Sequence, residues 1–175
     1  MIKNLIKKIF SKIYGESYDI YLLRKSGAKI GRNFYYDNSY IDGSFRYLIE
    51  IGDNVTFTHA TILAHDASTK IPLGKTKIGK VCIGNDVFIG YGTIILPNVK
   101  IGSQVVIGAG SVVNHDLPDN CIAVGNPCHP VGNYDSFVNK NRENMLTHPV
   151  FDLASARQSS QEISSKLKDS FGYID

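Results

Sequence analysis

The chain has 175 residues, of which 43% are hydrophobic and 20% are charged, a composition typical of a globular protein. Its formal net charge of +3 is small and its basic residues are spread along the chain, which argues against nucleic-acid binding. No apolar run is long enough to cross a bilayer, and the three cysteines form neither a disulfide framework nor a CxxC pair. Reduced cysteines and a cytoplasmic location are therefore expected.

Residues 2–14 predict a basic amphipathic helix within an N-terminal segment at residues 1–27. Isoleucines and Leu5 recur there at helical spacing, and lysines lie on or near the other side. The segment lacks the uninterrupted apolar stretch and the small-residue cleavage site of a secretory signal. We expect such a helix to pack on the end of a domain or on a neighbouring subunit. The alternative is a peripheral contact with the inner face of a membrane.

A repeat of six residues runs through the middle of the chain, and it is the main indication of the fold. An aliphatic β-branched residue recurs at every sixth position, at Ile83, Ile89, Ile95, Ile101, Ile107 and Val113. A small or aliphatic residue follows four positions after each, at Val87, Thr93, Val99, Val105, Ser111 and Leu117. An earlier block follows the same rule, with Ile51, Phe57 and Leu63 and, four positions after each, Val55, Thr61 and Ala67.

This period fits neither an amphipathic helix nor a simple alternating strand. It fits short parallel strands joined by tight turns, each of which swings the chain onto the next flat face of a prism, with the β-branched residues inside. Three faces make one coil, and stacked coils make an all-β solenoid, which we place at residues 28–133. A β-sandwich with irregular strands is the alternative, but six consecutive matches at one spacing argue against it.

The register of the repeat breaks twice. The polar, lysine-rich stretch at residues 68–80 predicts a loop that leaves the prism, and loops on rigid scaffolds commonly carry function. The other break lies between Ile30 and Ile51, in a stretch rich in Tyr, Asp and Asn. After the repeat, residues 134–147 and 153–171 predict polar helices separated by Pro149, so a helical C-terminal tail is expected at residues 134–175.

The repeat resembles the hexapeptide-repeat family of left-handed parallel β-helices. Within that family, HDAST, the lysine-rich loop and IGNDVFIGYGTIILPNVKIG look like the polysaccharide-associated sugar O-acetyltransferases. The stretch IGAGSVVNHDLPDNCIAVGNPCHPV resembles the acetyl-CoA-binding end of galactoside, maltose and xenobiotic acetyltransferases. The resemblance implies a left-handed β-helix, acetyl-CoA as co-substrate and a homotrimer with active sites between neighbouring prisms.

His65 is the residue that we expect to act as a general base. Histidine changes charge near neutral pH, and acyl transfer from a thioester to a hydroxyl needs one base, an oxyanion donor and a groove for both substrates. The similar enzymes carry their catalytic histidine in the corresponding coil beside the loop. Asp66, the next residue, is a candidate to orient the ring; the alternative is that both residues only shape a turn.

His59 is the rival base, because serine acetyltransferases carry theirs in a similar His-Ala-Thr context. The γ-class carbonic anhydrases place zinc-binding histidines on the same fold, but at a different spacing and with a further histidine about two coils earlier. Here His59 and His65 are six residues apart and no histidine precedes His59. We therefore expect no metal.

The resemblance also assigns contacts to the two substrates. Acetyl-CoA contacts fall on six positions of the later coils, namely Tyr91, Ala109, Asn114, His115, Asn126 and His129. Positions 115 and 129 usually carry a fixed positive charge in the relatives, so lysines of the loop are candidates to meet the nucleotide phosphates instead. Sugar-acceptor contacts fall on Asp37 or Asn38 and on Asp42; the alternative is that these are irregular turn residues.

Together these patterns predict an enzyme that moves an acetyl group directly from acetyl-CoA to a sugar hydroxyl in surface-polysaccharide biosynthesis, such as that of a capsule or O-antigen. Two alternatives stay open. One is transfer to an amine, on an amino sugar or a serine-like acceptor. The other is a non-catalytic β-helix that serves as a scaffold.

Overall fold

A computed structural model describes residues 11–12, 17–158, 160–167 and 170–175. The chain divides into two compact units, residues 1–134 and 135–175. Apart from residues 11 and 12, which are helical, the helix predicted at residues 2–14 lies outside the described residues. Among the described helices, none combines the length and the apolar character needed to cross a membrane.

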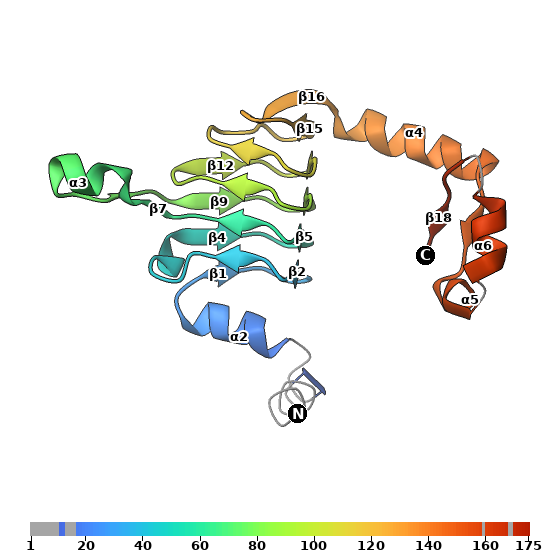
Figure 1. Ribbon diagram of the computed structural model, residues 1–175, viewed down its shortest axis with the longest axis horizontal. Helices are drawn as coiled ribbons and strands as arrows, with labels where there is room; N and C mark the ends of the chain where they lie inside the picture. The colour runs from blue at the N-terminus through green and yellow to red at the C-terminus, as the bar shows by residue number, and fades with distance from the viewer. Residues whose placement is uncertain (1–10, 13–16, 159, 168–169) are drawn as a thin grey trace. The chain divides into compact units, whose positions relative to one another are not determined.

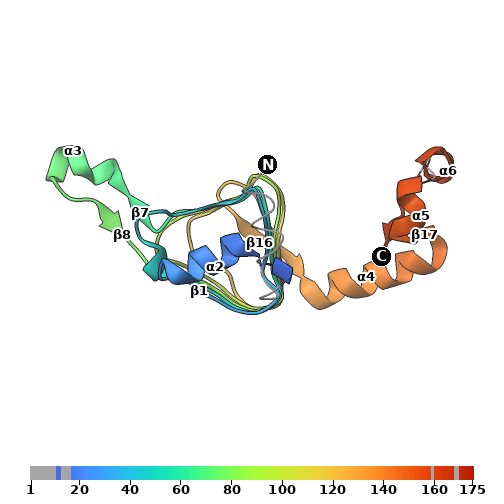
Figure 2. The same ribbon diagram turned by 90° about the horizontal axis from the view of Figure 1, so that it is seen from below.

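The first unit is a three-faced prism in which each face is a sheet of parallel strands from successive coils (Figures 1 and 2). The first sheet contains β1 (Lys29–Ile30), β4 (Ile49–Ile51), β9 (Val81–Ile83) and β12 (Val99–Ile101). The second contains β2 (Tyr35–Asp37), β5 (Val55–Thr58), β10 (Val87–Ile89), β13 (Val105–Ile107) and β15 (Cys121–Val124). The third contains β3 (Tyr40–Ile41), β6 (Thr61–Ile62), β11 (Ile94–Ile95) and β14 (Val112–Val113).

The chain visits the first, second and third sheets in turn, and each such round is one coil. Coils 1 to 4 begin at β1, β4, β9 and β12, and a fifth begins where Leu117 bridges to Ile101 and continues into β15. β16 (His129–Asn133) then pairs antiparallel with β15 and closes that end of the second sheet. The predicted left-handed parallel β-helix is confirmed.

The inside of the prism is the hydrophobic core, and the six-residue repeat supplies it. All twelve repeat positions from Ile83 to Leu117 are buried, including the polar side chains of Thr93 and Ser111. Their hydroxyls donate to the carbonyl of Gly108, which satisfies their hydrogen-bonding capacity inside the prism. Aliphatic side chains stacked coil on coil therefore hold the fold together by removing apolar surface from water.

In the earlier block the predicted phase is wrong after Phe57. Ala60, Ile62 and Ala64 are buried instead of Thr61, Leu63 and Ala67. The reason is a shorter turn: only residues 59 and 60 separate β5 from β6, whereas residues 90–93 separate β10 from β11. Because this turn is shorter, the residues that point into the prism on the next face come one position earlier in the sequence.

The turns between faces form three corners, which we name by the sheets that they join. The first corner joins the first sheet to the second, the second corner joins the second to the third, and the third corner leads on to the next coil. At the first corner the coils approach so closely that a Cβ on Gly84 would lie 2.7 Å from the backbone of Gly102. Only glycine fits at such a position.

An arm leaves the third corner of coil 2, at the place of the predicted loop. It consists of β7 (His65–Asp66), a 3₁₀ turn η2 (Ala67–Thr69), a short helix α3 (Lys70–Leu73) and β8 (Lys77–Ile78). β7 and β8 pair antiparallel, so the arm returns to the prism beside its own start. Figures 1 and 2 show it projecting from the prism, with α3 at its end.

The second register break is explained by a smaller excursion at the same corner of coil 1. There the 3₁₀ turn η1 (Arg46–Leu48) lies between β3 and β4. Both excursions therefore leave the prism at the third corner, one coil apart.

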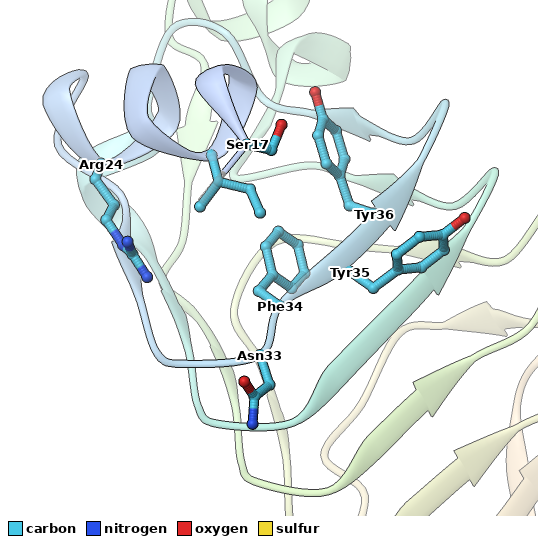
Figure 3. Close-up of a pocket in the computed structure, with 7 residues that line it drawn as sticks. Ser17, Arg24, Asn33, Phe34, Tyr35 and Tyr36 are labelled. Carbon is cyan, nitrogen blue, oxygen red and sulfur yellow. The ribbon is translucent and has the colours of Figure 1, made fainter. Parts of the chain in front are cut away.

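A helix, α2 (Tyr18–Lys25), covers the first coil. The Ser17 side chain accepts a hydrogen bond from the Asp19 amide at its start, and Leu23 is buried against the core. Arg24 donates to the carbonyls of Ile30 and Gly31, at 3.1 and 2.7 Å. A pocket of about 350 Å³ lies between this helix and β2, with the ring of Phe34 near its centre (Figure 3).

The second unit is a small helical segment with one two-stranded sheet. It contains α4 (Tyr134–Thr147), β17 (Val150–Phe151), α5 (Leu153–Gln158), α6 (Ser160–Lys166) and β18 (Tyr173–Ile174). The predicted helix at 134–147 agrees with α4. The single helix predicted at 153–171 is instead two short helices followed by β18, which pairs in parallel with β17.

Candidate active site

Asp42 and His65 form a hydrogen-bonded pair at the third corner. Asp42 follows β3 in coil 1, and His65 begins the arm in coil 2, 23 residues later. Nδ1 of His65 donates to Oδ2 of Asp42, since an ionised carboxylate only accepts. The Asp42 side chain is fully buried, whereas that of His65 is 31% exposed. The pair thus links an anchor inside the protein to a ring that reaches its surface.

Backbone amides hold the Asp42 carboxylate in place. Oδ2 accepts from the Ala64 amide at 2.9 Å, and Oδ1 accepts from the amides of Ser44 at 2.9 Å and Phe45 at 3.3 Å. Burial by itself raises the pKa of Asp42, but the hydrogen bonds from His65 and from the Ser44 and Ala64 amides outweigh it, so the net pKa is lowered. The carboxylate is therefore ionised at neutral pH.

The contacts of the His65 ring determine which nitrogen is basic. Because Nδ1 carries the proton shared with Asp42, Nε2 of the neutral ring is the lone-pair nitrogen. Within the described residues Nε2 makes no hydrogen bond. The Phe45 ring packs beside the imidazole, with ring centres 5.2 Å apart. Chemically, the arrangement is a positioned base, because its orienting partner is fixed and its basic atom is available.

The sequence alone does not identify the residue that orients His65, and Asp66 is the candidate that it suggests. Asp66 instead accepts from the Ser68 amide at 2.8 Å and lies 3.4 Å from Nζ of Lys77. Both contacts lie within the arm, so Asp66 shapes the arm. Asp42, which was predicted among the acceptor contacts, is fully buried and offers no oxygen to a bound sugar.

The other predicted residues divide between two corners. Tyr91 and Ala109 occupy the second corner of coils 3 and 4, and the exposed Asn126 follows β15 at the same corner. Asn114 and His115 lie at the third corner of coil 4, where their side chains form a 2.8 Å hydrogen bond. The ring of His129, at the start of β16, lies 4.9 Å from that of His115.

His59, Asp37 and Asn38 also belong to the second corner. Nδ1 of His59 is 3.6 Å from Oδ2 of Asp37, and Asn38 donates to Oδ1 of Asp37 at 3.1 Å. Two histidine–carboxylate pairs therefore stand at opposite edges of the third sheet. His59 precedes β6 and His65 follows it, so the two histidines of one chain lie at opposite edges of this face.

Of the loop lysines considered for the nucleotide phosphates, two have acidic partners. Lys77 lies beside Asp66, and Nζ of Lys80 is 2.9 Å from Glu50. Lys75 is exposed on the arm. Among the residues that the structure describes, no group of three or more His, Cys, Asp or Glu side chains is arranged to hold a metal ion.

Comparisons with known proteins agree with this architecture. The family model described as bacterial transferase hexapeptide (six repeats) matches residues 83–115. The chain is 40% identical over 147 residues to Protein CapG of Staphylococcus aureus, covering 79% of this chain and 85% of that protein. It is 34% identical over 138 residues to galactoside O-acetyltransferase of Escherichia coli strain K12, covering 74% of this chain and 66% of that enzyme.

Among solved structures, the chain is similar to a galactoside acetyltransferase in complex with coenzyme A. The identity is 30% and the TM-score is 0.50, over 65% of this chain and 58% of that one. The chain thus spans 85% of CapG, but only 66% of the E. coli galactoside enzyme and 58% of the chain in the coenzyme A complex.

The three-faced stack of coils defines a class of proteins, the β-helices built from hexapeptide coils. This chain belongs to the hexapeptide-repeat transferase family.

Proposed function

We propose that this protein is an O-acetyltransferase that moves an acetyl group from acetyl-CoA to a sugar hydroxyl, with His65 as the general base. The Asp42–His65 pair carries the proposal, because a buried, ionised carboxylate holds Nδ1 and leaves Nε2 as the basic atom. The relatives support the substrate class. A sequence relative is a galactoside O-acetyltransferase, and a similar solved structure is a galactoside acetyltransferase in complex with coenzyme A.

The geometry supports direct transfer. Nε2 of His65 accepts the proton of the acceptor hydroxyl, and the hydroxyl oxygen attacks the thioester carbonyl carbon. Backbone N–H groups beside the bound thioester stabilise the oxyanion that forms. The C–S bond then breaks, and His65 returns its proton to the leaving thiolate. Asp42 keeps the ring in one tautomer and stabilises its positive charge between these two steps.

The second corner of the later coils suits the acetyl-CoA chain. Ala109 has a small side chain, and Gly92 and Gly110 have φ values of 71° and 70° with no neighbouring atom within 4 Å of an added Cβ. The backbone there is open to a ligand that lies along the coils. Asn126 belongs to the same corner, and Asn114, His115 and His129 would meet the far end of the ligand.

A second copy of the chain completes the proposed site. His65 stands at the third corner, and the open backbone around Ala109 stands at the second corner, with the third sheet between them. If the second corner of a neighbouring prism lies against His65, the base and the cofactor are brought together. In a cyclic trimer, one kind of interface forms three such sites.

The outer surface of the second sheet supports such an assembly. The register aligns one outward position per strand, and these positions carry Tyr35, Thr56, Phe88, Val106 and Ile122. Tyr35 and Phe88 are 59% and 43% exposed. The corresponding row of the first sheet carries Lys29, Glu50, Cys82 and Lys100. This mostly apolar row, exposed at Tyr35 and Phe88, favours the second sheet over the charged first sheet as a contact between copies.

The acceptor that we propose is a sugar unit of a surface polysaccharide such as a capsule or O-antigen. The resemblance of the HDAST segment and the arm to polysaccharide-associated acetyltransferases supports this acceptor. Transfer to an amino group and a scaffold role without catalysis are the outcomes that would replace it.

The test combines acetyl-CoA with a panel of simple glycosides, amino sugars, serine and polysaccharides, with thiol release and product mass as readouts. We expect acetyl esters of sugars, and we expect His65→Ala to lower turnover by about 100-fold or more. Coenzyme A should still raise the melting temperature of that variant. His148→Ala, a change in the second unit, should leave turnover unchanged.

Three results would overturn parts of the proposal. Absence of both thiol release and thermal stabilisation at millimolar coenzyme A would identify a scaffold. Acetylation of amines alone would identify an N-acetyltransferase. Full turnover in His65→Ala would remove His65 as the base.

A further inference from the structure

The tip of the arm carries apolar side chains that the prism does not use. Ile71 and Leu73, both on α3, are 97% and 69% exposed, and Ile71 is more exposed than any other large apolar residue that the structure describes. Pro72 lies between them and Gly74 follows, so four successive residues lack a polar side chain. Figures 1 and 2 show α3 at the end of the arm, away from the core. Packing within the chain does not account for these residues, whereas an apolar contact outside it does.

Hydrogen bonds within the tip fix its shape. The Gly74 amide donates to the Lys70 carbonyl at 2.9 Å, and the Thr69 hydroxyl donates to the Lys75 carbonyl at 2.7 Å. Gly74 has a φ of 65°, the left-handed conformation that ends α3. Pro72 has no amide hydrogen that needs a partner. The tip is thus an ordered turn with several of its backbone groups satisfied internally, which lowers the cost of moving it into a less polar medium.

The apolar residues lie between two lysines, Lys70 and Lys75, whose side chains are exposed. Nζ of Lys70 lies 3.4 Å from the Gly74 carbonyl, and within the described residues neither lysine forms a salt bridge. The sequence has no Asp or Glu between residues 67 and 85. The tip therefore combines positive charge with side chains that avoid water.

An anionic lipid surface matches both properties. Aliphatic side chains at the end of a protruding turn can enter the boundary between headgroups and acyl chains, where they leave water. Lysines beside them keep their ammonium groups among the lipid phosphates while their hydrocarbon stems lie deeper. The order Lys-Ile-Pro-Leu-Gly-Lys places the apolar residues in the middle and the charges at both sides, as such a contact requires.

A second copy of the chain is the other surface that could cover the tip, and charge disfavours it. The favoured contact between copies is the outward row of the second sheet, which carries Tyr35, Thr56, Phe88, Val106 and Ile122. None of these residues is acidic, so Lys70 and Lys75 would lose water there without gaining a partner. The chain as a whole also has a formal net charge of +3, which repels a second positive surface.

We propose that the tip of the arm, residues 70–75, inserts into the surface of a bilayer that contains anionic lipids. Ile71 and Leu73 reach the boundary of the acyl chains, and Lys70 and Lys75 bind the phosphates. This contact goes beyond the proposed acetyl transfer and does not depend on it. Six residues of chain lead from His65 to Ile71, so the bilayer surface lies within roughly 20 Å of the proposed base. Together with the proposed reaction, this position suits an acceptor that is anchored in the same bilayer.

The chain contains no tryptophan, so one introduced tryptophan reports its own surroundings. Leu73→Trp places it at the tip, and Leu146→Trp, at a position 84% exposed in the second unit, is the matched control. Emission is recorded for the full chain at millimolar lipid, because a contact of this size is weak. The vesicles contain phosphatidylcholine alone or mixed with phosphatidylglycerol, with and without brominated acyl chains. With the anionic vesicles we expect a blue shift and quenching for Leu73→Trp only, since only the tip leaves water.

Variants without tryptophan measure the contribution of each part of the tip by cosedimentation with the same vesicles. Ile71→Ser/Leu73→Ser should lower the partition coefficient about tenfold or more, because two aliphatic side chains lose their burial. Lys70→Gln/Lys75→Gln should weaken binding at low salt, and the binding that remains should vary less with salt.

Matched controls for the two kinds of change lie in the second unit. Leu146→Ser and Lys140→Gln should bind the vesicles as the wild type does. All of the changed side chains are exposed, so the melting temperatures should stay at the wild-type value and show that the variants are folded.

Failure of the wild type to bind anionic vesicles overturns the proposal, as does an unchanged emission spectrum of Leu73→Trp. Wild-type binding by Ile71→Ser/Leu73→Ser also overturns it and assigns the lipid contact to another segment, such as residues 2–14. A blue shift of Leu73→Trp that appears without lipid and grows with protein concentration identifies a second copy as the occupant instead. None of these readouts uses acetyl transfer, so each result holds whether or not the proposed reaction occurs.

Discussion

The carboxylate of Asp42 accepts the Nδ1 proton of His65 across two successive coils, although 23 residues separate them in the chain. Asp42 is fully buried and is held by three backbone amides, whereas His65 reaches the surface at the start of the arm. The rigid member of the pair, Asp42, therefore lies inside the prism, and the proposed base, His65, lies at the surface where the arm begins.

Asp42→Asn should lower turnover by on the order of tenfold to 1000-fold. The amide NH₂ of asparagine would face another hydrogen-bond donor, either Nδ1–H of His65 or a backbone N–H, so the His65 ring would lose its orientation. The same change in Asp66, whose carboxylate contacts Ser68 and Lys77 of the arm, should have a much smaller effect. Steady-state turnover of the two variants at saturating substrates is the measurement. Equal losses in both would show that the Asp42–His65 bond is not what positions the base.

Asp42 should also make stability depend on pH in one direction. Its folded pKa is lowered, because the hydrogen bonds from His65, Ser44 and Ala64 outweigh the effect of burial. A group with a lowered folded pKa contributes stability that is fully present above its unfolded pKa of about 4 and is lost as pH falls through the folded pKa. The difference in unfolding free energy between the wild type and Asp42→Asn, measured by urea unfolding, should shrink as the pH falls below about 4. A difference that grows below this pH would contradict this account.

Two glycines offer a matched test of coil packing. A Cβ on Gly84 would lie 2.5 Å from Oγ of Ser103 and 2.7 Å from the backbone of Gly102, whereas nothing lies within 4 Å of one on Gly43. Gly84→Ala should therefore destabilise the protein by about 1–3 kcal/mol, because backbone in the next coil must shift. Gly43→Ala should be nearly neutral. Thermal unfolding of both variants decides the matter, and similar melting temperatures would mean that the coils can separate at little cost.

If the site is shared between copies, two inactive variants should restore activity together. His65→Ala removes the proposed base at the third corner, and Ala109→Phe blocks the proposed acetyl-CoA position at the second corner. Co-refolded as mixed trimers, about a quarter of the interfaces would combine an intact His65 with an intact Ala109. Activity of about that fraction of the wild type is the expected result. A mixture as inactive as its components would place the whole site within one chain.

Part of this protein can be predicted from local pattern alone. The twelve repeat positions from Ile83 to Leu117 are all buried, because inward and outward positions on a flat face depend only on the spacing along the chain. For the same reason a loop could be predicted at residues 68–80, where the spacing fails, although the arm already begins at His65. The choice of His65 over His59 as base rested on its place beside that break and on the resemblance to the sugar acetyltransferases, and it remains a prediction.

Tertiary structure decided what depends on how the coils stack. The turn at residues 59 and 60 is shorter than its counterparts above, and the inward positions after Phe57 moved by one residue, which no local pattern showed. Asp66 is the neighbour of His65 in sequence, yet Asp42 is its partner, because coil stacking brings residues one full turn apart into contact. Spacing along the chain determined which side chains face the core, and packing between coils determined which polar groups meet at the corners.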